Sequence, residues 1–244
     1  MKRVAQLFCI GGMFAAPVTA QARESREVQP ERPTVATHAG TVAPGFLEVE
    51  WGGELSPGSN LSLPVYFKLG MRERLQLGLL VPVSDTRLRG VAVGDMQVAL
   101  KVRVTDNHPV LGDFAIQPSL SLPTGSGIDG SQYAVLLISS HEFGKLAVDI
   151  NAGLQVSTTS TSDRQEWLWM LSLGAPFTGK WGWVGELSGT GTTGSSTTQL
   201  LAGPTYRLHS WFALDAGVIA PARPTGDVRF YVGGVTNTGR VFGK

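Results

Sequence analysis

The fold is decided by residues 97–104, Gln97-Val98-Ala99-Leu100-Lys101-Val102-Arg103-Val104. Valine or leucine occupies every second position, and Gln, Ala, Lys and Arg stand between them. Because successive side chains of a β-strand point to opposite faces, this stretch predicts a strand with one apolar and one polar face. Residues 113–122 and 145–156 alternate in the same way.

Segments of this kind recur from Phe46 onward, separated by turn residues. Membrane-spanning strands have about 9–11 residues and this spacing. The sequence therefore predicts an all-β fold, a single closed antiparallel up-and-down transmembrane β-barrel of about 12 strands. The predicted strands cover residues 46–54, 61–70, 74–83, 95–105, 113–122, 132–141, 145–156, 165–175, 181–189, 198–207, 211–219 and 227–235.

Composition narrows the class of protein. The chain has 244 residues, of which 42% are apolar and 16% charged, so it is neither a disordered chain nor too long for one domain. After the N-terminal region the longest purely apolar run is 134–138, whereas a spanning helix needs about 20 apolar residues. Membrane insertion would therefore require a closed barrel, which satisfies its backbone groups without water. A soluble β-sandwich or barrel remains an alternative, since it also shows alternation.

The N-terminus has the pattern of a secretory signal. Lys2 and Arg3 precede an apolar stretch that ends near Val18, and Ala20 closes a Val-Thr-Ala cleavage pattern. We predict a signal peptide over residues 1–20, export to an outer membrane, and a barrel over residues 46–244. Residues 21–45 are polar and contain Pro30, Pro33 and Pro44, which predicts an extended periplasmic leader or a plug that enters the barrel.

Removing this signal also removes Cys9, the single cysteine. The mature chain then has no disulfide and no thiolate ligand. The formal net charge of +1 becomes slightly negative, so no basic surface for nucleic acid is expected.

The links between predicted strands alternate in length, as expected for short periplasmic turns opposite longer external loops. The long links are 84–94, 123–131, 157–164 and 190–197, and the short ones are 71–73, 142–144, 176–180 and 208–210. The tryptophans also lie at the two ends of the predicted strands. Trp167 and Trp169 open a strand at its external end, whereas Trp181, Trp183 and Trp211 open strands at the periplasmic end. This placement predicts two aromatic girdles, with core packing as the alternative.

Charged residues fall on the polar face of the predicted strands. We predict that the basic side chains face the acidic ones across the lumen and set the selectivity of a solute pathway. The alternative is an ion-pair network that closes the barrel. The predicted pathway residues are Glu48, Glu50, Lys68, Lys101, Arg103, Asp149, Glu186, Arg207, Asp215 and Arg229.

Several phrases resemble one family of outer-membrane barrels. They are Glu31-Arg32-Pro33 before Thr41-Val42-Ala43-Pro44-Gly45, then Gly94-Asp95, Leu122-Pro123-Thr124-Gly125 and Leu214-Asp215-Ala216-Gly217. In this order they resemble the "putative MetA-pathway of phenol degradation" family. The resemblance implies a transporter-like barrel that passes hydrophobic or aromatic small molecules, not a phenol-degrading enzyme. Such barrels usually end on an aromatic residue, whereas here Phe242 stands two residues from the end.

The sequence offers little catalytic chemistry. Ser139 and His141 could form a lipid-hydrolysing pair, but spacing suggests no acid to orient the imidazole. A polar strand terminus is the simpler interpretation. No His-x-His, His-Glu-x-x-His or paired-cysteine spacing appears, so we predict no metal, no cofactor and no enzymatic activity.

The leading hypothesis is a passive channel for small solutes. A non-conducting structural or adhesive barrel is the first alternative, and an outer-membrane lipid hydrolase is the second. The expected partners are outer-membrane lipid, lipopolysaccharide, the barrel-assembly machinery and a small-molecule solute.

Overall fold

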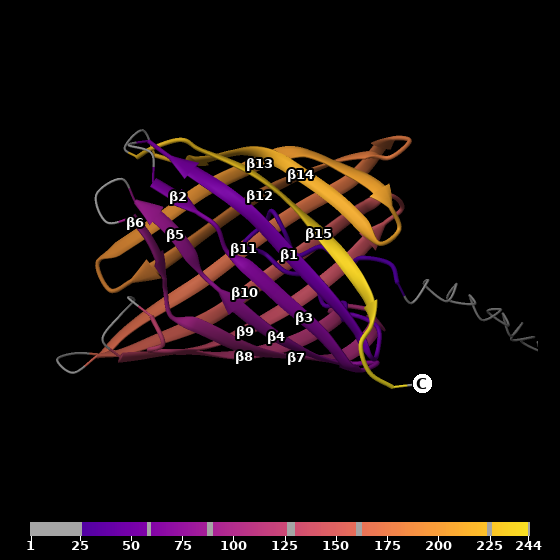
Figure 1. The fold of residues 1–244 in the computed structure, drawn as a ribbon, viewed down its shortest axis with the longest axis horizontal. Coiled ribbons are helices and arrows are strands. Elements are labelled where there is room, and N and C mark those ends of the chain that lie inside the picture. Colours follow the sequence, from indigo (N-terminus) through magenta and orange to yellow (C-terminus); the bar gives the residue numbers. More distant parts are fainter. Residues whose placement is uncertain are drawn as a thin grey trace, which may run out of the picture.

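A closed antiparallel barrel forms the body of the molecule. The computed structural model describes residues 26–57, 60–86, 90–125, 130–159, 163–223 and 226–243. The sheet closes because β15 pairs with β1 as well as with β14. The result is a 12-strand antiparallel barrel, which confirms the predicted fold (Figure 1). Its wall strands are β1 (Phe46–Ser56), β3 (Val65–Arg72), β4 (Leu75–Val81), β7 (Met96–His108), β8 (Gly112–Leu122), β9 (Gly130–Phe143), β10 (Leu146–Thr159), β11 (Asp163–Thr178), β12 (Trp181–Thr192), β13 (Ser195–His209), β14 (Phe212–Pro221) and β15 (Arg229–Arg240).

The two faces of the wall follow the alternation of the sequence. On β7, Val98, Leu100 and Val102 are exposed outside, whereas Ala99 and Lys101 are buried inside. A soluble β fold places its apolar side chains inside and its polar side chains outside. The wall of this barrel has the opposite arrangement, as a membrane-spanning barrel does. No helix in the described ranges is long and apolar enough to cross a membrane.

The two ends of the barrel differ. β1 begins and β15 ends at the same end, on the right in Figure 1, and we call it the terminus end. We call the other end, where β1 finishes, the loop end. The terminus end carries short turns, at residues 73–74, 109–111, 144–145, 179–180 and 210–211.

Two prolines interrupt the wall near the loop end. The predicted strand 61–70 is broken at Pro64 into β2 (Asn60–Ser62) and β3, and the predicted strand 74–83 is broken at Pro82 into β4 and β5 (Val83–Thr86). Proline has no N–H to donate to a β-ladder. Beyond the breaks, β2, β5 and β6 (Gly90–Val93) extend the sheet beside β1, so part of the predicted loop 84–94 is strand.

Other predicted loops are also shorter than expected. β12 and β13 continue to a two-residue turn at 193–194, where the predicted loop 190–197 was placed, and Gly194 takes a φ of 95° there. β15 runs to Arg240 rather than ending at residue 235. Trp211 lies in the turn before β14 and not on it. Serine- and threonine-rich strand ends pair with each other here, and their composition alone does not separate them from loops.

A segment without regular structure occupies the barrel interior. Residues 26–45, here named the lumenal segment, precede β1 and run inside the barrel (Figure 1). Val28, Ala36, Ala39 and Val42 are almost completely buried there. The predicted signal peptide 1–20 and residues 21–25 lie outside the described residues.

Candidate functional site

The predicted pathway residues all lie on the inward side of the wall, but the structure gives most of them partners other than those expected. The prediction paired basic and acidic residues of the wall with each other across the lumen. Only Lys68 pairs with predicted wall acids, Glu48 and Glu50. The structure does not test whether these residues set selectivity, so that part stays a prediction.

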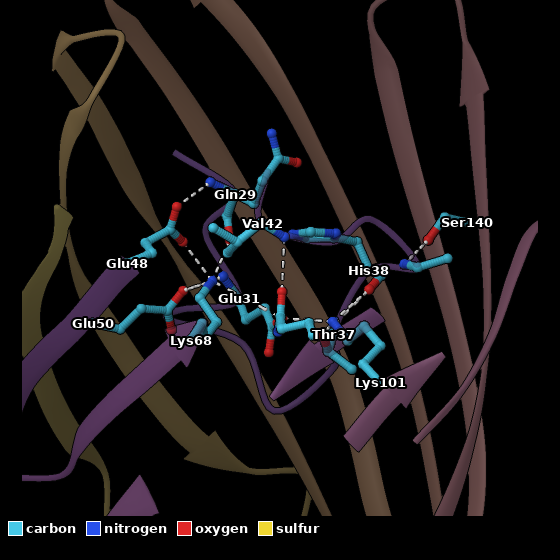
Figure 2. Close-up of polar contacts among 12 residues, drawn as sticks. Gln29, Glu31, Thr37, His38, Val42, Glu48, Glu50, Lys68, Lys101 and Ser140 are labelled. Atoms are coloured by element: carbon cyan, nitrogen blue, oxygen red, sulfur yellow. Dashed lines mark hydrogen bonds and ion pairs between the residues drawn. The ribbon is translucent and has the colours of Figure 1, made fainter. Parts of the chain in front are cut away.

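Lys68 on β3 is the centre of a buried charge cluster (Figure 2). Its Nζ lies 2.5 Å from Glu48 Oε1 and 2.6 Å from Glu50 Oε1. Glu48 lies directly opposite Lys68 in the β1–β3 ladder, where a cross-strand pair is in closest contact. Nζ also donates to the backbone oxygen of Gln29 in the lumenal segment. The cluster therefore joins the wall to the segment.

Lys101 on β7 binds the segment rather than the wall acids predicted for it. Its Nζ lies 2.5 Å from Glu31 Oε1, 2.7 Å from Thr37 Oγ1 and 2.8 Å from the backbone oxygen of His38 (Figure 2). Although burial alone would raise the pKa of the Glu31 carboxyl, Lys101 and Lys68 hold it below its usual range. Burial, assisted by Lys101, lowers the pKa of His38 to about 3, so its ring is neutral near pH 7.

Wall side chains also accept the backbone N–H groups of the segment. A buried N–H needs a partner, and a chain without secondary structure has none of its own. Side chains of β1, β4, β9, β10 and β12 supply the acceptors. The donor–acceptor pairs are Gln29 to Glu48 at 2.8 Å, Glu31 to Glu50 at 2.7 Å, Ala36 to Glu186 at 2.8 Å, Thr37 to Asn151 at 2.7 Å, Ala39 to Ser140 at 2.8 Å and Val42 to Gln76 at 2.9 Å.

The remaining predicted residues are dispersed along the lumen. Asp215 pairs with Arg32 of the segment at 3.5 Å, and Asp149 accepts from Ser140 at 2.6 Å. The three arginines lie toward the barrel ends, where each has an acidic partner that the sequence did not suggest. Arg103 pairs with Asp106 at 3.1 Å, Arg207 pairs with Glu27, and Arg229 pairs with Glu54.

Glycines on the wall make room for the segment. A Cβ on Gly70 would overlap the carbonyl oxygens of Val42 and Ala43, and a Cβ on Gly52 would overlap the Arg32 guanidinium. At Gly70 the obstacle is backbone, which cannot swing away as a side chain can. Gly70 therefore fixes how closely the segment lies against β3.

Gly70→Val should displace the segment from β3 and raise the conductance of the reconstituted protein. Overpacking of this kind destabilises by about 1–3 kcal/mol, which should also lower the midpoint of unfolding. Single-channel recording and thermal unfolding measure the two effects. Gly191→Val is the matched control, because nothing lies within 4 Å of a Cβ at that position. Equal conductance in Gly70→Val and Gly191→Val would contradict the role given to Gly70 in setting the position of the segment.

Two cavities lie on opposite sides of the segment. The terminus-end cavity, of about 850 Å³, is lined by Thr34 and by charged residues that include Arg32, Lys145 and Asp149. The loop-end cavity, of about 360 Å³, is lined by Val35 and has a different wall. Since adjacent residues face different cavities, the crossing of the segment at Thr34–Val35 forms the partition between them.

Ser139 and His141 do meet, on β9. Ser139 Oγ lies 3.0 Å from His141 Nε2, and the serine hydroxyl also donates to the backbone oxygen of Leu111 at 2.7 Å. A serine whose proton is directed to a carbonyl is not activated by the neighbouring imidazole. The ring of His141 stacks on Phe143 at 5.9 Å. These contacts are those of a polar strand terminus.

The neutral acceptors Gln76, Ser140 and Asn151 were not predicted from the sequence. Their inward parity was available from the strand pattern, but no local signal says that a polar side chain binds a distant backbone. Glu31 stands out in the sequence only as part of the Glu31-Arg32-Pro33 phrase. Trp211, predicted to lie in the periplasmic girdle, has the Arg26 guanidinium 5.0 Å from its ring centre.

The architecture defines the chain as a porin-like β-barrel with an occupied lumen. No protein-family model and no curated protein matches it. Its fold is similar to those of three solved outer-membrane proteins. The KdgM porin has a TM-score of 0.57 at 16% identity over 78% of this chain and 98% of its own.

The two other structures also share the fold at low sequence identity. The COG4313 outer membrane channel from Pseudomonas putida F1 has a TM-score of 0.58 at 15% identity, over 86% of this chain and 100% of its own. The NanC porin has a TM-score of 0.61 at 11% identity, over 78% of this chain and 99% of its own. At these identities the likeness shows the shared barrel fold, and the MetA-pathway family is not established by it.

Proposed function

We propose that the chain is a passive outer-membrane channel for small solutes, narrowed by its own N-terminal segment. The observation that carries the proposal is a closed barrel with an apolar exterior and two solute-sized cavities in its lumen. Exposed large apolar side chains surround the wall, among them Leu100, Leu137, Ile150 and Leu171. Soluble proteins rarely expose apolar surface on this scale, whereas a lipid bilayer requires it.

The orientation follows from the ends of the barrel. The terminus end carries the short turns, so we place it at the periplasm, with the loop end outside the cell. A secretory signal over residues 1–20 would deliver the chain to the assembly machinery, and the loop end would contact lipopolysaccharide. Heat-modifiable migration on a detergent gel, combined with outer-membrane fractionation, tests this placement. Recovery of the protein in the soluble periplasm would refute it.

The solute class is the finer part of the proposal. The resemblance to the MetA-pathway family implies hydrophobic or aromatic small molecules. The KdgM and NanC proteins are described as porins and the Pseudomonas putida protein as a channel, which supports transport rather than catalysis. We therefore propose passive diffusion of small molecules and no enzymatic step.

A non-conducting barrel is the second candidate, because the segment makes many contacts with the wall. Purified protein should admit small solutes into proteoliposomes and give discrete conductance steps in planar bilayers. The rate of solute entry should increase with the amount of folded barrel, as judged on a detergent gel. Heat-denatured protein is the control. A folded protein that passes neither ions nor uncharged solutes would favour the structural role.

A further inference from the structure

The loop-end cavity differs in chemistry from the rest of the lumen. Residues of seven neighbouring strands, β7 to β13, line it together with Val35. Each described residue that lines it is uncharged. The terminus-end cavity, in contrast, is lined by Arg32, Lys145, Asp149 and Asp215 among others.

Uncharged polar and apolar side chains share the lining of the loop-end cavity. Four strands contribute an amide, three strands contribute hydroxyls, and β9, β11 and the lumenal segment contribute apolar side chains. The amides are Gln97, Gln117, Gln155 and Gln199, the hydroxyls are those of Ser119, Ser188, Thr190 and Thr197, and the apolar residues are Val35, Ala134, Leu136, Leu168 and Met170. An amide both donates and accepts hydrogen bonds without carrying charge. The lining therefore suits a molecule that has hydrogen-bonding groups on an apolar frame.

One of these amides has an unused acceptor. Gln117 Oε1 is buried and has no hydrogen-bond partner among the described residues. Gln117 lies directly opposite Leu136 in the β8–β9 ladder, and both line the cavity. Since buried polar atoms are nearly always paired, this oxygen points to a hydroxyl or amine group of a bound molecule or to water.

Among the described residues, the charged side chains that contact the cavity lining through Gln155 and Gln199 have partners of opposite charge. Arg164 pairs with Glu166 at 2.9 Å, and Arg229 pairs with Glu54 while also donating to Gln199 at 2.6 Å. An ion that entered the cavity would lose hydration and would meet no free counter-charge in the described lining. A neutral molecule would avoid this loss and could cover the apolar side chains.

We propose that the loop-end cavity is a binding subsite that selects uncharged molecules with hydroxyl or amide groups on an apolar frame. The inference rests on the proposed channel function and adds the solute class. A volume of about 360 Å³ suits a small solute, near the lower limit of roughly 300–1,000 Å³ for ligand pockets.

Osmotic swelling of proteoliposomes that contain the full chain tests the selection. Three solutes of similar size serve as probes, namely methyl glucoside, glucosamine as the cation and gluconate as the anion. We expect both ions to enter about tenfold more slowly than methyl glucoside, the factor given by a modest desolvation penalty. Equal or faster entry of either ion would overturn the inference while leaving the channel intact. Exclusion of all three would count against the channel itself.

The double substitution Gln117→Glu with Gln155→Glu adds negative charge to the cavity at nearly constant shape. It should lower the entry rates of methyl glucoside and gluconate and raise the entry rate of glucosamine. Gln165→Glu is the matched control, because Gln165 lies on the outward parity of β11 beside the exposed Trp167. Folding of each variant is checked by heat-modifiable migration. If the folded double variant and the control behave alike, the cavity does not select the solute.

Discussion

Lys68→Met should release the lumenal segment and raise the channel conductance several-fold. The substitution leaves Glu48 and Glu50 buried without the ammonium that lies 2.5 and 2.6 Å from them. Removing one partner of a buried ion pair costs about 3–5 kcal/mol. The 12-strand ladder is held by its own backbone hydrogen bonds, whereas the segment is held mainly by side chains. The penalty is therefore relieved most easily when the segment leaves and water hydrates the carboxylates.

Single-channel recording measures the conductance, and limited proteolysis measures access to residues 26–45. Arg74→Met is the control, since it removes a charge from an ion pair with Asp106 in which the arginine side chain is 53% exposed. Exposed pairs contribute about 0–1 kcal/mol, so this variant should resemble the parent protein. Adding Glu48→Gln and Glu50→Gln to Lys68→Met removes the uncompensated charge and should restore part of the docking. Unchanged conductance and proteolysis in folded Lys68→Met would contradict the role given to the cluster.

The sequence predicts the barrel well because its information is local. Alternation with period two places each wall side chain inside or outside without knowledge of the rest of the chain. It placed Lys101 inside and Leu100 outside, as the structure does. Strand ends were less accurate, because serine and threonine occur both in loops and in strands that extend beyond the apolar band. The breaks at Pro64 and Pro82 were also accessible from the sequence.

The partners of the inward-facing side chains could not be predicted from the sequence, because they lie far away along the chain. Lys101 and Glu31 are separated by 70 positions, and Ala36 and Glu186 by 150. The lumenal segment has no periodicity that assigns its residues to a particular side of the barrel. The sequence therefore left a periplasmic leader and a lumenal plug as alternatives for residues 21–45, and it did not indicate which wall residues bind them. The charges predicted to line a pathway mostly hold this segment, and the loop-end cavity lies beside uncharged residues instead.

A disulfide between the segment and the wall should abolish the conductance gain of Lys68→Met. Ala39 N donates to Ser140 Oγ at 2.8 Å, so the Ser140 side chain contacts the backbone of Ala39, and this proximity makes the pair a candidate for a cross-link. Cys9, the single native cysteine, falls in the predicted signal peptide, so Ala39→Cys with Ser140→Cys would introduce one defined pair. Such a cross-link typically stabilises by about 2–4 kcal/mol, similar to the penalty that drives release.

Under oxidising conditions the triple variant should conduct like the parent protein, and dithiothreitol should raise its conductance to that of Lys68→Met. Disulfide formation is followed by the shift in migration on a non-reducing gel. Lys68→Met with Ser140→Cys alone is the control and should not respond to the reductant. If the cross-linked barrel still shows the high conductance, then ions pass the segment without its release. The conductance would then be controlled by the space beside Thr34 and Val35, where the two cavities are separated, and not by movement of the segment.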